Sequence, residues 1–222
     1  MTTAIIVAAG KSERMGNGTD KAFLSLGNKP VVAWSLLAFE RCPAVDRIVL
    51  VVRKDQQVAA KAVCQMFGIS KLAKIVPGGN RRQESVAAGL AACDIDTRTV
   101  VIHDGARPLV SSEVIAEVVK LGARTGAATA GRRVTDTVKR VEKGTTVAGT
   151  EDREKLWQVQ TPQAFQFRVL RDAYRALGKN EVTDDCSAVE LAGGTVKIFE
   201  TRQPNFKITT VEDLQLASAL LK

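Results

Sequence analysis

The chain has 222 residues, of which 45% are hydrophobic and 25% charged, the composition of an ordinary globular protein with a sizeable core. It contains no run of about 18 apolar residues, and its N-terminus has neither a basic region nor a cleavage site, so we expect a cytoplasmic protein with no membrane partner. The net charge of +8 is compatible with nucleic acid, a membrane surface or small polyanions. Because like charges form no long run or helical stripe, small anionic substrates are favoured over nucleic acid.

The N-terminal segment predicts a buried strand followed by a phosphate-binding loop. Residues 4–9 form an unbroken apolar run, which is typical of a strand buried on both faces of a parallel sheet. The next segment, from Gly10 to Lys21, contains three glycines and three cations, which suit close approach of the backbone to a phosphate. It is not a P-loop, because residue 5 is Ile, and not a dinucleotide fingerprint, because residue 12 is Ser.

Apolar patterns then alternate between strand and helix. Buried strands are predicted at 47–53, 74–76 and 99–103, and helices at 30–41, 55–66 and 82–93. This alternation predicts a Rossmann-like, doubly wound α/β fold, with a mostly parallel sheet and helices on both faces.

The pattern changes from about residue 131. Residues 132–141 alternate apolar and polar side chains, which predicts a strand with one exposed face; 142–145 supply a turn, and 146–148 run back. We therefore expect a single domain over 1–222, in which 132–153 form a projecting β-arm. Further helices are predicted at 168–177, 187–191 and 211–221, and a strand at 196–199.

Two motifs follow predicted strands and could carry chemistry. In 77–85, two glycines precede a helix N-terminus, an arrangement that favours anions but also occurs in ordinary βα turns. In 103–108, Asp104 follows a strand at the sheet edge where ligands bind; it could hold a ribose hydroxyl or hydrated Mg²⁺, or cap a turn. The single histidine, His103, should point to the opposite face and is interpreted as structural.

Two C-terminal segments have plainer interpretations. Residues 183–185, Thr-Asp-Asp, are typical of a helix cap. Residues 205–209 predict a short strand that carries Lys207, which in isolation would be an ordinary surface lysine.

Together these motifs resemble one family. The motifs are, in order, Ala8-Ala9-Gly10-x3-Arg14-Met15, Lys21, Gly78-Gly79-x5-Ser85-Val86, His103-Asp104-x-Ala106-Arg107-Pro108, Asp136-Thr137-Val138-Lys139, Arg153-x2-Leu156-Trp157, Thr161-Pro162-Gln163, Thr183-Asp184 and Asn205-x-Lys207-Ile208-Thr209. In this order and spacing the chain resembles the 2-C-methyl-D-erythritol 4-phosphate cytidylyltransferases over nearly its whole length.

The resemblance implies transfer of a cytidylyl group from CTP to methylerythritol phosphate in the non-mevalonate isoprenoid pathway, with release of pyrophosphate. It also implies Mg²⁺ as cofactor, and a homodimer in which each arm reaches the partner subunit. By the same resemblance, Arg14 and Lys21 are the catalytic residues that stabilise the transition state. The residues implied in CTP binding are Ala8, Ala9, Gly10, Lys11, Gly79, Asn80, Ser85, Asp104 and Gly105. Those implied in positioning the polyol phosphate are Arg107, Thr137, Arg153 and Lys207, with Asp104 as a metal candidate.

The sequence departs from the family pattern in two places that bear on the site. Asp20 stands before Lys21 where proline is usual, and Asn80 stands where some relatives carry an acid that contacts the cytosine. The alternative is a cytidylyltransferase for another polyol phosphate, such as ribitol 5-phosphate, which shares the fold and the CTP loop. The arm motif at 136–139 and the motif at 153–157 favour methylerythritol phosphate.

Overall fold

The computed structural model describes residues 1–10 and 21–221, so the predicted site residues Lys11 and Arg14 lie outside the described part of the chain. Its strands are β1 Thr2–Ala8, β2 Ser25–Leu26, β3 Lys29–Pro30, β4 Arg47–Val52, β5 Leu72–Pro77, β6 Thr99–Asp104, β7 Ala127–Arg133, β8 Lys139–Val141, β9 Val147–Thr150, β10 Trp157–Gln166 and β11 Lys197–Glu200. Its helices are α1 Val31–Arg41, α2 Gln57–Met66, α3 Arg82–Ala91, α4 Ser112–Thr125, α5 Phe167–Ala176, α6 Asp185–Leu191 and α7 Val211–Leu220.

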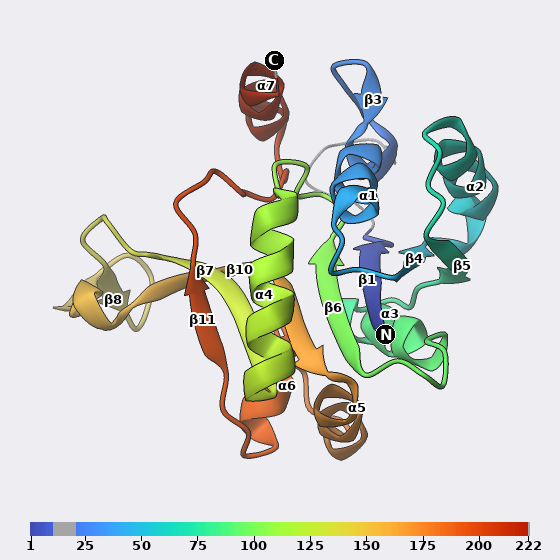
Figure 1. Cartoon of the computed structure of the whole chain (residues 1–222). Helices are drawn as coiled ribbons and strands as arrows, with labels where there is room; N and C mark the ends of the chain where they lie inside the picture. Colours follow the sequence, from blue (N-terminus) through green and yellow to red (C-terminus); the bar gives the residue numbers. More distant parts are fainter. Residues whose placement is uncertain (11–20, 222) are drawn as a thin grey trace.

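The described residues form a seven-stranded sheet in the order β11-β7-β10-β6-β1-β4-β5 (Figure 1). Neighbouring strands are parallel except where β10 pairs antiparallel with β6 and β7. The predicted α/β fold with a mostly parallel sheet is therefore confirmed. Since β1 lies between β4 and β6, the loops that leave β1 and β6 diverge, which opens a crevice at the carboxyl ends of these two strands.

Alternation along each strand divides the core into two layers. In β1, Ala4 and Ile6 face a cluster that includes residues of α1, α2 and α4, whereas Ile5 faces a cluster with residues of α3, α5 and α6. Because successive side chains point to opposite faces, a fully apolar strand needs helices on both sides. This is why the continuous apolar runs of the sequence become central strands.

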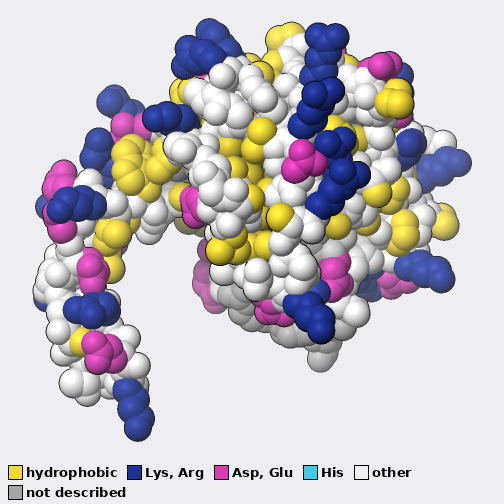
Figure 2. Space-filling model, turned by 90° about the horizontal axis from the view of Figure 1, so that it is seen from below, with side chains coloured by type: hydrophobic (Ala, Val, Ile, Leu, Met, Phe, Trp, Pro, Cys, Tyr) yellow, Lys and Arg dark blue, Asp and Glu magenta, His cyan; other side chains and the backbone are white. Residues whose placement is uncertain are grey.

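The arm differs from its prediction in one respect. The predicted strand over 132–141 is wrong as a single strand, because β7 ends at Arg133 and β8 begins at Lys139. Strand β7 loses its partner there, since β10 begins at Trp157, which pairs with Arg133. Beyond this point β8 and β9 form a separate antiparallel hairpin that projects from the body (Figures 1 and 2).

The strand predicted at 205–209 is also wrong, because these residues form no ladder. The apolar side chain that suggested a strand, Ile208, is instead buried in a small cluster with Leu26, Val31 and Ala217. Its backbone N–H donates to the carbonyl of Ala106 at 2.8 Å, which fixes the segment against the loop after β6.

Sequence patterns also missed α4, β7 and β10. Strand β7 is mostly alanine and glycine, which have low β-propensity. Strand β10 contains Pro162, which argues against a central strand; the register shift between Val159 and Gln163 accommodates it. Within the described residues, no helix is both long and apolar enough to cross a membrane.

Candidate active site

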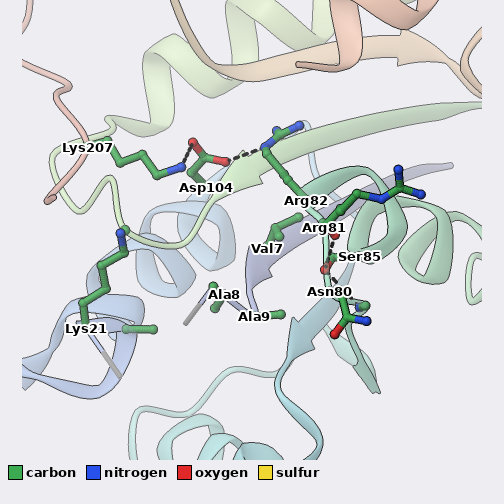
Figure 3. A pocket seen from close by; sticks show the side chains of 14 residues that line it. Val7, Ala8, Ala9, Lys21, Asn80, Arg81, Arg82, Ser85, Asp104 and Lys207 are labelled. Atoms are coloured by element: carbon green, nitrogen blue, oxygen red, sulfur yellow. Dashed lines mark hydrogen bonds and ion pairs between the residues drawn. The ribbon is translucent and has the colours of Figure 1, made fainter. Parts of the chain in front are cut away.

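A cavity opens at the carboxyl ends of β1 and β6 (Figure 3). Its wall comes from the end of β1, the 3₁₀ turn Lys21–Phe23, the loop before α3, the end of β6 and the segment that carries Lys207. Of the predicted site residues it brings together Ala8, Ala9, Gly10, Lys21, Gly79, Asn80, Ser85, Asp104 and Lys207. Residues that lie up to 199 positions apart (8 to 207) thus meet at one edge of the sheet.

Glycines allow the loop before α3 to approach β1. A Cβ atom at Gly78 would lie 2.5 Å from the Ala9 Cβ and 2.6 Å from the Ser85 Oγ. At Gly79, the added atom would lie 2.4 Å from the Glu84 Cβ. The backbone N–H of Gly79 donates to the Ser85 hydroxyl at 3.2 Å, so the loop closes over the first turn of the helix.

The loop after β6 is fastened to β1 in the same way. The N–H of Gly105 donates to the carbonyl of Val7 at 2.8 Å, and a Cβ there would lie 3.1 Å from that of Ala8. Gly105, predicted to contact CTP, does not line the cavity. Its contacts instead set where Asp104 stands.

Asp104 is the electrostatic centre of the site. The residue is 6% exposed, and its carboxylate contacts Arg82 Nε at 3.1 Å, Lys207 Nζ at 3.0 Å and Arg107 Nε at 3.5 Å. Burial alone would raise the pKa of this carboxyl, but the charges of Arg82, Lys207 and Arg107 outweigh burial and hold it far below its usual range. One anion surrounded by three cations leaves an excess of positive charge, which suits a polyanionic ligand.

A buried chain of hydrogen bonds through His103 and Thr161 fixes the backbone of Asp104. His103 is fully buried; its Nε2 lies 3.2 Å from the carbonyl of Arg107, and its Nδ1 lies 3.1 Å from the Thr161 hydroxyl. Because a carbonyl can only accept, Nε2 carries the proton and Nδ1 accepts from Thr161, whose oxygen in turn accepts the Asp104 N–H at 3.1 Å. Burial lowers the pKa of His103 to about 3, so the ring stays neutral. These contacts agree with the predicted structural role of His103.

A second cavity shares a wall with the first. It is lined by Arg82, Asp104 and Lys207, which also line the first cavity, and by Arg107, the middle of β10 and the residues before α6. Figure 3 shows Lys207, Asp104 and Arg82 in a row, joined by their ion pairs, with Lys21 extending from below toward the Lys207 end of the row. Two anionic ligands, one in each cavity, would meet at this row.

The two predicted arm residues line neither cavity. Thr137 is exposed between β7 and β8, and Arg153, also exposed, donates through Nη1 to the carbonyl of Thr135 at 2.7 Å. Within one chain, therefore, the described residues do not bring Thr137 or Arg153 to Asp104.

The main residue that the sequence analysis missed is Arg82. It lies in the first turn of α3, where the helix dipole disfavours a cation, so an arginine directly after a glycine loop was a signal. Arg82 is held in place by two carboxylates, those of Asp104 and Asp185, which raise its pKa above the ordinary value although burial opposes this. The second carboxylate comes from α6, which the sequence could not place.

The donor set does not fit a protein-held magnesium ion. Mg²⁺ takes an octahedron of oxygen ligands, often with one or two carboxylates. The described residues contain no group of three or more His, Cys, Asp or Glu side chains able to hold a metal, and both oxygens of Asp104 already contact basic groups. The prediction that Asp104 binds a metal directly therefore finds no support in this geometry.

Known proteins match the chain over its whole length. The family model for 2-C-methyl-D-erythritol 4-phosphate cytidylyltransferase matches residues 2–222. The protein of that name from Pelotomaculum thermopropionicum is 46% identical over 222 residues, which cover 99% of this chain and 93% of the relative. The chain belongs to this family. Among solved structures, the 4-diphosphocytidyl-2C-methyl-D-erythritol synthase from Anaerococcus prevotii is 30% identical with a TM-score of 0.87, covering 99% of this chain and 95% of that one. The cytidylyltransferase from Thermus thermophilus has a TM-score of 0.80 at 30% identity, covering 98% and 97%.

Proposed function

We propose that the two cavities divide the substrates of the family reaction, with CTP in the first and 2-C-methyl-D-erythritol 4-phosphate in the second. As a member of the family, the chain is a cytidylyltransferase that converts these substrates to 4-diphosphocytidyl-2-C-methyl-D-erythritol and pyrophosphate. The observation that carries the assignment is the shared wall of Arg82, Asp104 and Lys207, which would bring two phosphate groups together.

The reaction requires cations that stabilise phosphate charge rather than a general base. A phosphate oxygen of the polyol phosphate attacks the α-phosphorus of CTP, the bond from that phosphorus to the bridging oxygen breaks, and its electron pair leaves with pyrophosphate. The nucleophile is already an anion, so no proton needs to be removed. His103, buried and neutral, is accordingly left to a structural role.

Most of the predicted residues have a place in this scheme. Lys21, with Arg14 from outside the described residues, would neutralise the charge that grows on the phosphoryl oxygens. The ends of β1 and of the loop before α3 would hold CTP, and Lys207 and Arg107 would hold the polyol phosphate. Mg²⁺ would enter only as a counter-ion of the CTP phosphates, and no step here depends on it.

We propose further that the second cavity is completed by the arm of a second subunit in a homodimer. Thr137 and Arg153 line neither cavity of their own chain, yet the family resemblance assigns both to the polyol phosphate. The arm also exposes apolar side chains, with Val141 and Val147 43% and 55% exposed. A two-stranded hairpin is marginally stable alone, so these side chains favour burial against another chain.

A single assay tests the function. Purified protein is incubated with radiolabelled CTP and either methylerythritol phosphate or ribitol 5-phosphate, and the cytidylylated product and pyrophosphate are measured. We expect turnover with methylerythritol phosphate and a kcat/KM for it at least a hundredfold above that for ribitol 5-phosphate, the order of discrimination that a site with specific polar contacts reaches. A preference for ribitol 5-phosphate would replace the proposed acceptor, and no product with either would refute the proposal.

A further inference from the structure

Next to the shared wall of the two cavities, the half-buried Tyr174 and the buried Asp185 form a polar chain that leads to Arg82. The Tyr174 hydroxyl donates to Asp185 Oδ1 at 2.6 Å, and Asp185 Oδ2 accepts from Arg82 Nη2 at 2.9 Å. Arg82 then donates through Nε to Asp104 Oδ1 at 3.1 Å. The chain thus runs from α5, through the start of α6 and the first turn of α3, to the end of β6.

Neither Tyr174 nor Asp185 lines either of these two cavities, and the Asp185 side chain is completely buried. A buried carboxylate is unfavourable unless partners compensate its charge. A hydrophobic pair would hold α5 against α6 without the free-energy cost of desolvating a charge. The chain reaches the site at Arg82, whose side chain is 24% exposed. Its placement points to a role in the site.

Arg82 needs to be held because its position is intrinsically unfavourable. It lies in the first turn of α3, whose partial positive charge repels a cation, and in the same site as Arg107 and Lys207. Two carboxylates from different elements fix its guanidinium, Asp104 at the end of β6 through Nε and Asp185 at the start of α6 through Nη2. The relative strength of these two ion pairs determines how closely Arg82 approaches Asp104.

We propose that Tyr174 is a positioning residue, which acts through Asp185 to set the place of Arg82 at the wall between the two cavities. The hydroxyl of Tyr174 satisfies one oxygen of Asp185, so that Asp185 shares Arg82 with Asp104. Without that hydrogen bond, the buried charge of Asp185 attracts the guanidinium more strongly and draws it from Asp104. This inference deepens the proposed function and rests on its assignment of the two cavities.

The test begins with Tyr174→Phe, which keeps the ring and removes the hydroxyl. Steady-state kcat and KM are measured for CTP and for methylerythritol phosphate, with Ser112→Ala as the control. Ser112→Ala also removes a partly buried hydroxyl hydrogen bond, to the carbonyl of Ala38 at 2.9 Å, but Ser112 lines neither of the two cavities. We expect kcat/KM of Tyr174→Phe to fall about tenfold, a fraction of what a hydrogen bond to a charged group can contribute, with a raised KM for methylerythritol phosphate. Ser112→Ala should remain within about twofold of wild type.

The decisive measurement repeats Tyr174→Phe in an Arg82→Lys background, where one ammonium group replaces the two guanidinium nitrogens that bind Asp104 and Asp185. If Tyr174 acts through Arg82, its removal should then change kcat/KM by less than about twofold. An equal loss in both backgrounds would mean that Tyr174 does not act through Arg82 and only supports the fold, and would overturn the proposal. Should circular dichroism show Tyr174→Phe to be unfolded, Asp185→Asn takes its place in the same cycle under the same criteria.

The same data separate this inference from the proposed function. Wild-type kcat/KM in Arg82→Lys would refute the role of Arg82 in substrate binding, and with it the proposal that the shared wall brings the two phosphate groups together. A slow Arg82→Lys together with an unaffected Tyr174→Phe would refute the role of Tyr174 alone.

Discussion

At the scale of single residues, the site depends on how charge is placed around Asp104. The carboxylate stands at the end of a fully buried strand, where an uncompensated charge would be strongly unfavourable. Arg82, Arg107 and Lys207 compensate it, and their combined charge exceeds its own. The excess is available to phosphate groups, so the contacts that stabilise the buried aspartate also prepare the site for anions.

Lys21 should be essential for turnover. It lines the first cavity, and removing one pre-placed cation from a phosphoryl-transfer site reduces the rate by about a hundredfold or more. We expect Lys21→Ala to show this loss in kcat with unchanged circular dichroism. The matched control is Lys29→Ala, since Lys29 lies over the Trp34 ring, 4.3 Å from its centroid, and lines neither substrate cavity. Near-full kcat in Lys21→Ala would remove the lysine from the mechanism.

His103 should make the folded state less stable as the pH falls. Its pKa is about 3 in the folded protein, against an ordinary 6.5, so between these values the unfolded chain binds a proton that the folded chain does not. Stability is therefore retained above pH 6.5 and lost below it, by about 2 kcal/mol between pH 7 and pH 5. Carboxyls with lowered pKa values, such as Asp104, lose their stabilising effect only as the pH falls below about 4.5, so they do not account for the change between pH 7 and pH 5.

Urea unfolding at several pH values measures this effect, with His103→Gln as the comparison. The glutamine side chain can donate and accept but does not titrate in this range. Its stability should be lower but flat between pH 7 and pH 5. An equal slope in the two proteins would show that another group is responsible.

At the scale of elements, the sheet edge that carries the site is positioned by close packing of α4 on β10. Gly122 lies in α4 where a Cβ atom would be 2.4 Å from the carbonyl oxygen of Ala164 and 2.7 Å from its carbonyl carbon. Backbone atoms cannot rotate away as a side chain can, so this contact sets how near the helix lies to the strand. Strand β10 in turn carries Thr161, which holds Asp104 and His103.

Gly122→Ala should therefore destabilise the protein despite the higher helix propensity of alanine. Propensity alone would favour alanine by up to about 1 kcal/mol, whereas overpacking against the fixed backbone disfavours it by about 1–3 kcal/mol. We expect a net loss of about 1 kcal/mol in the free energy of unfolding, measured by urea titration. Lys120→Ala, on the exposed face of the same helix, should stay within about 0.5 kcal/mol of wild type. A more stable Gly122→Ala would contradict the close approach.

At the scale of the whole molecule, the arm is the part whose apolar side chains its own chain leaves uncovered. The hairpin β8–β9 projects from the body, and the space-filling view shows it surrounded by open space over much of its length (Figure 2). Val141 and Val147 are exposed there, while the residues that the resemblance assigns to substrate, Thr137 and Arg153, lie near its base. A second copy of the chain would both cover the apolar side chains and receive the polar ones.

Mixing two inactive variants tests whether the site is shared. If Lys21 and Arg153 of one site come from different chains, a mixed dimer of Lys21→Ala and Arg153→Ala has one intact site and one doubly defective site. Activity should return toward about a quarter of wild type when subunits exchange statistically, as expected of a twofold-symmetric dimer.

The control mixes Lys21→Ala with Lys207→Ala, two changes in the cavity of one chain, which should restore nothing. Absence of recovery in the first mixture, despite demonstrated subunit exchange, would mean that each chain completes its own site.

The sequence by itself determined the class of fold and most of the site loops. Apolar runs such as 4–9 and 48–52 can only be buried on both faces, and the glycines at 78 and 79 mark a close approach of backbone. Local patterns failed where a distant partner decides. The proline in β10 and the alanines of β7 are tolerated because neighbouring strands and α4 enclose them. The pairing of Arg82 with Asp185 needs two helices to meet, and the position of Lys207 depends on a cluster formed with α7. Tertiary structure alone decided these contacts, because the free energy of a buried charge or a packed segment depends on groups far away in the chain.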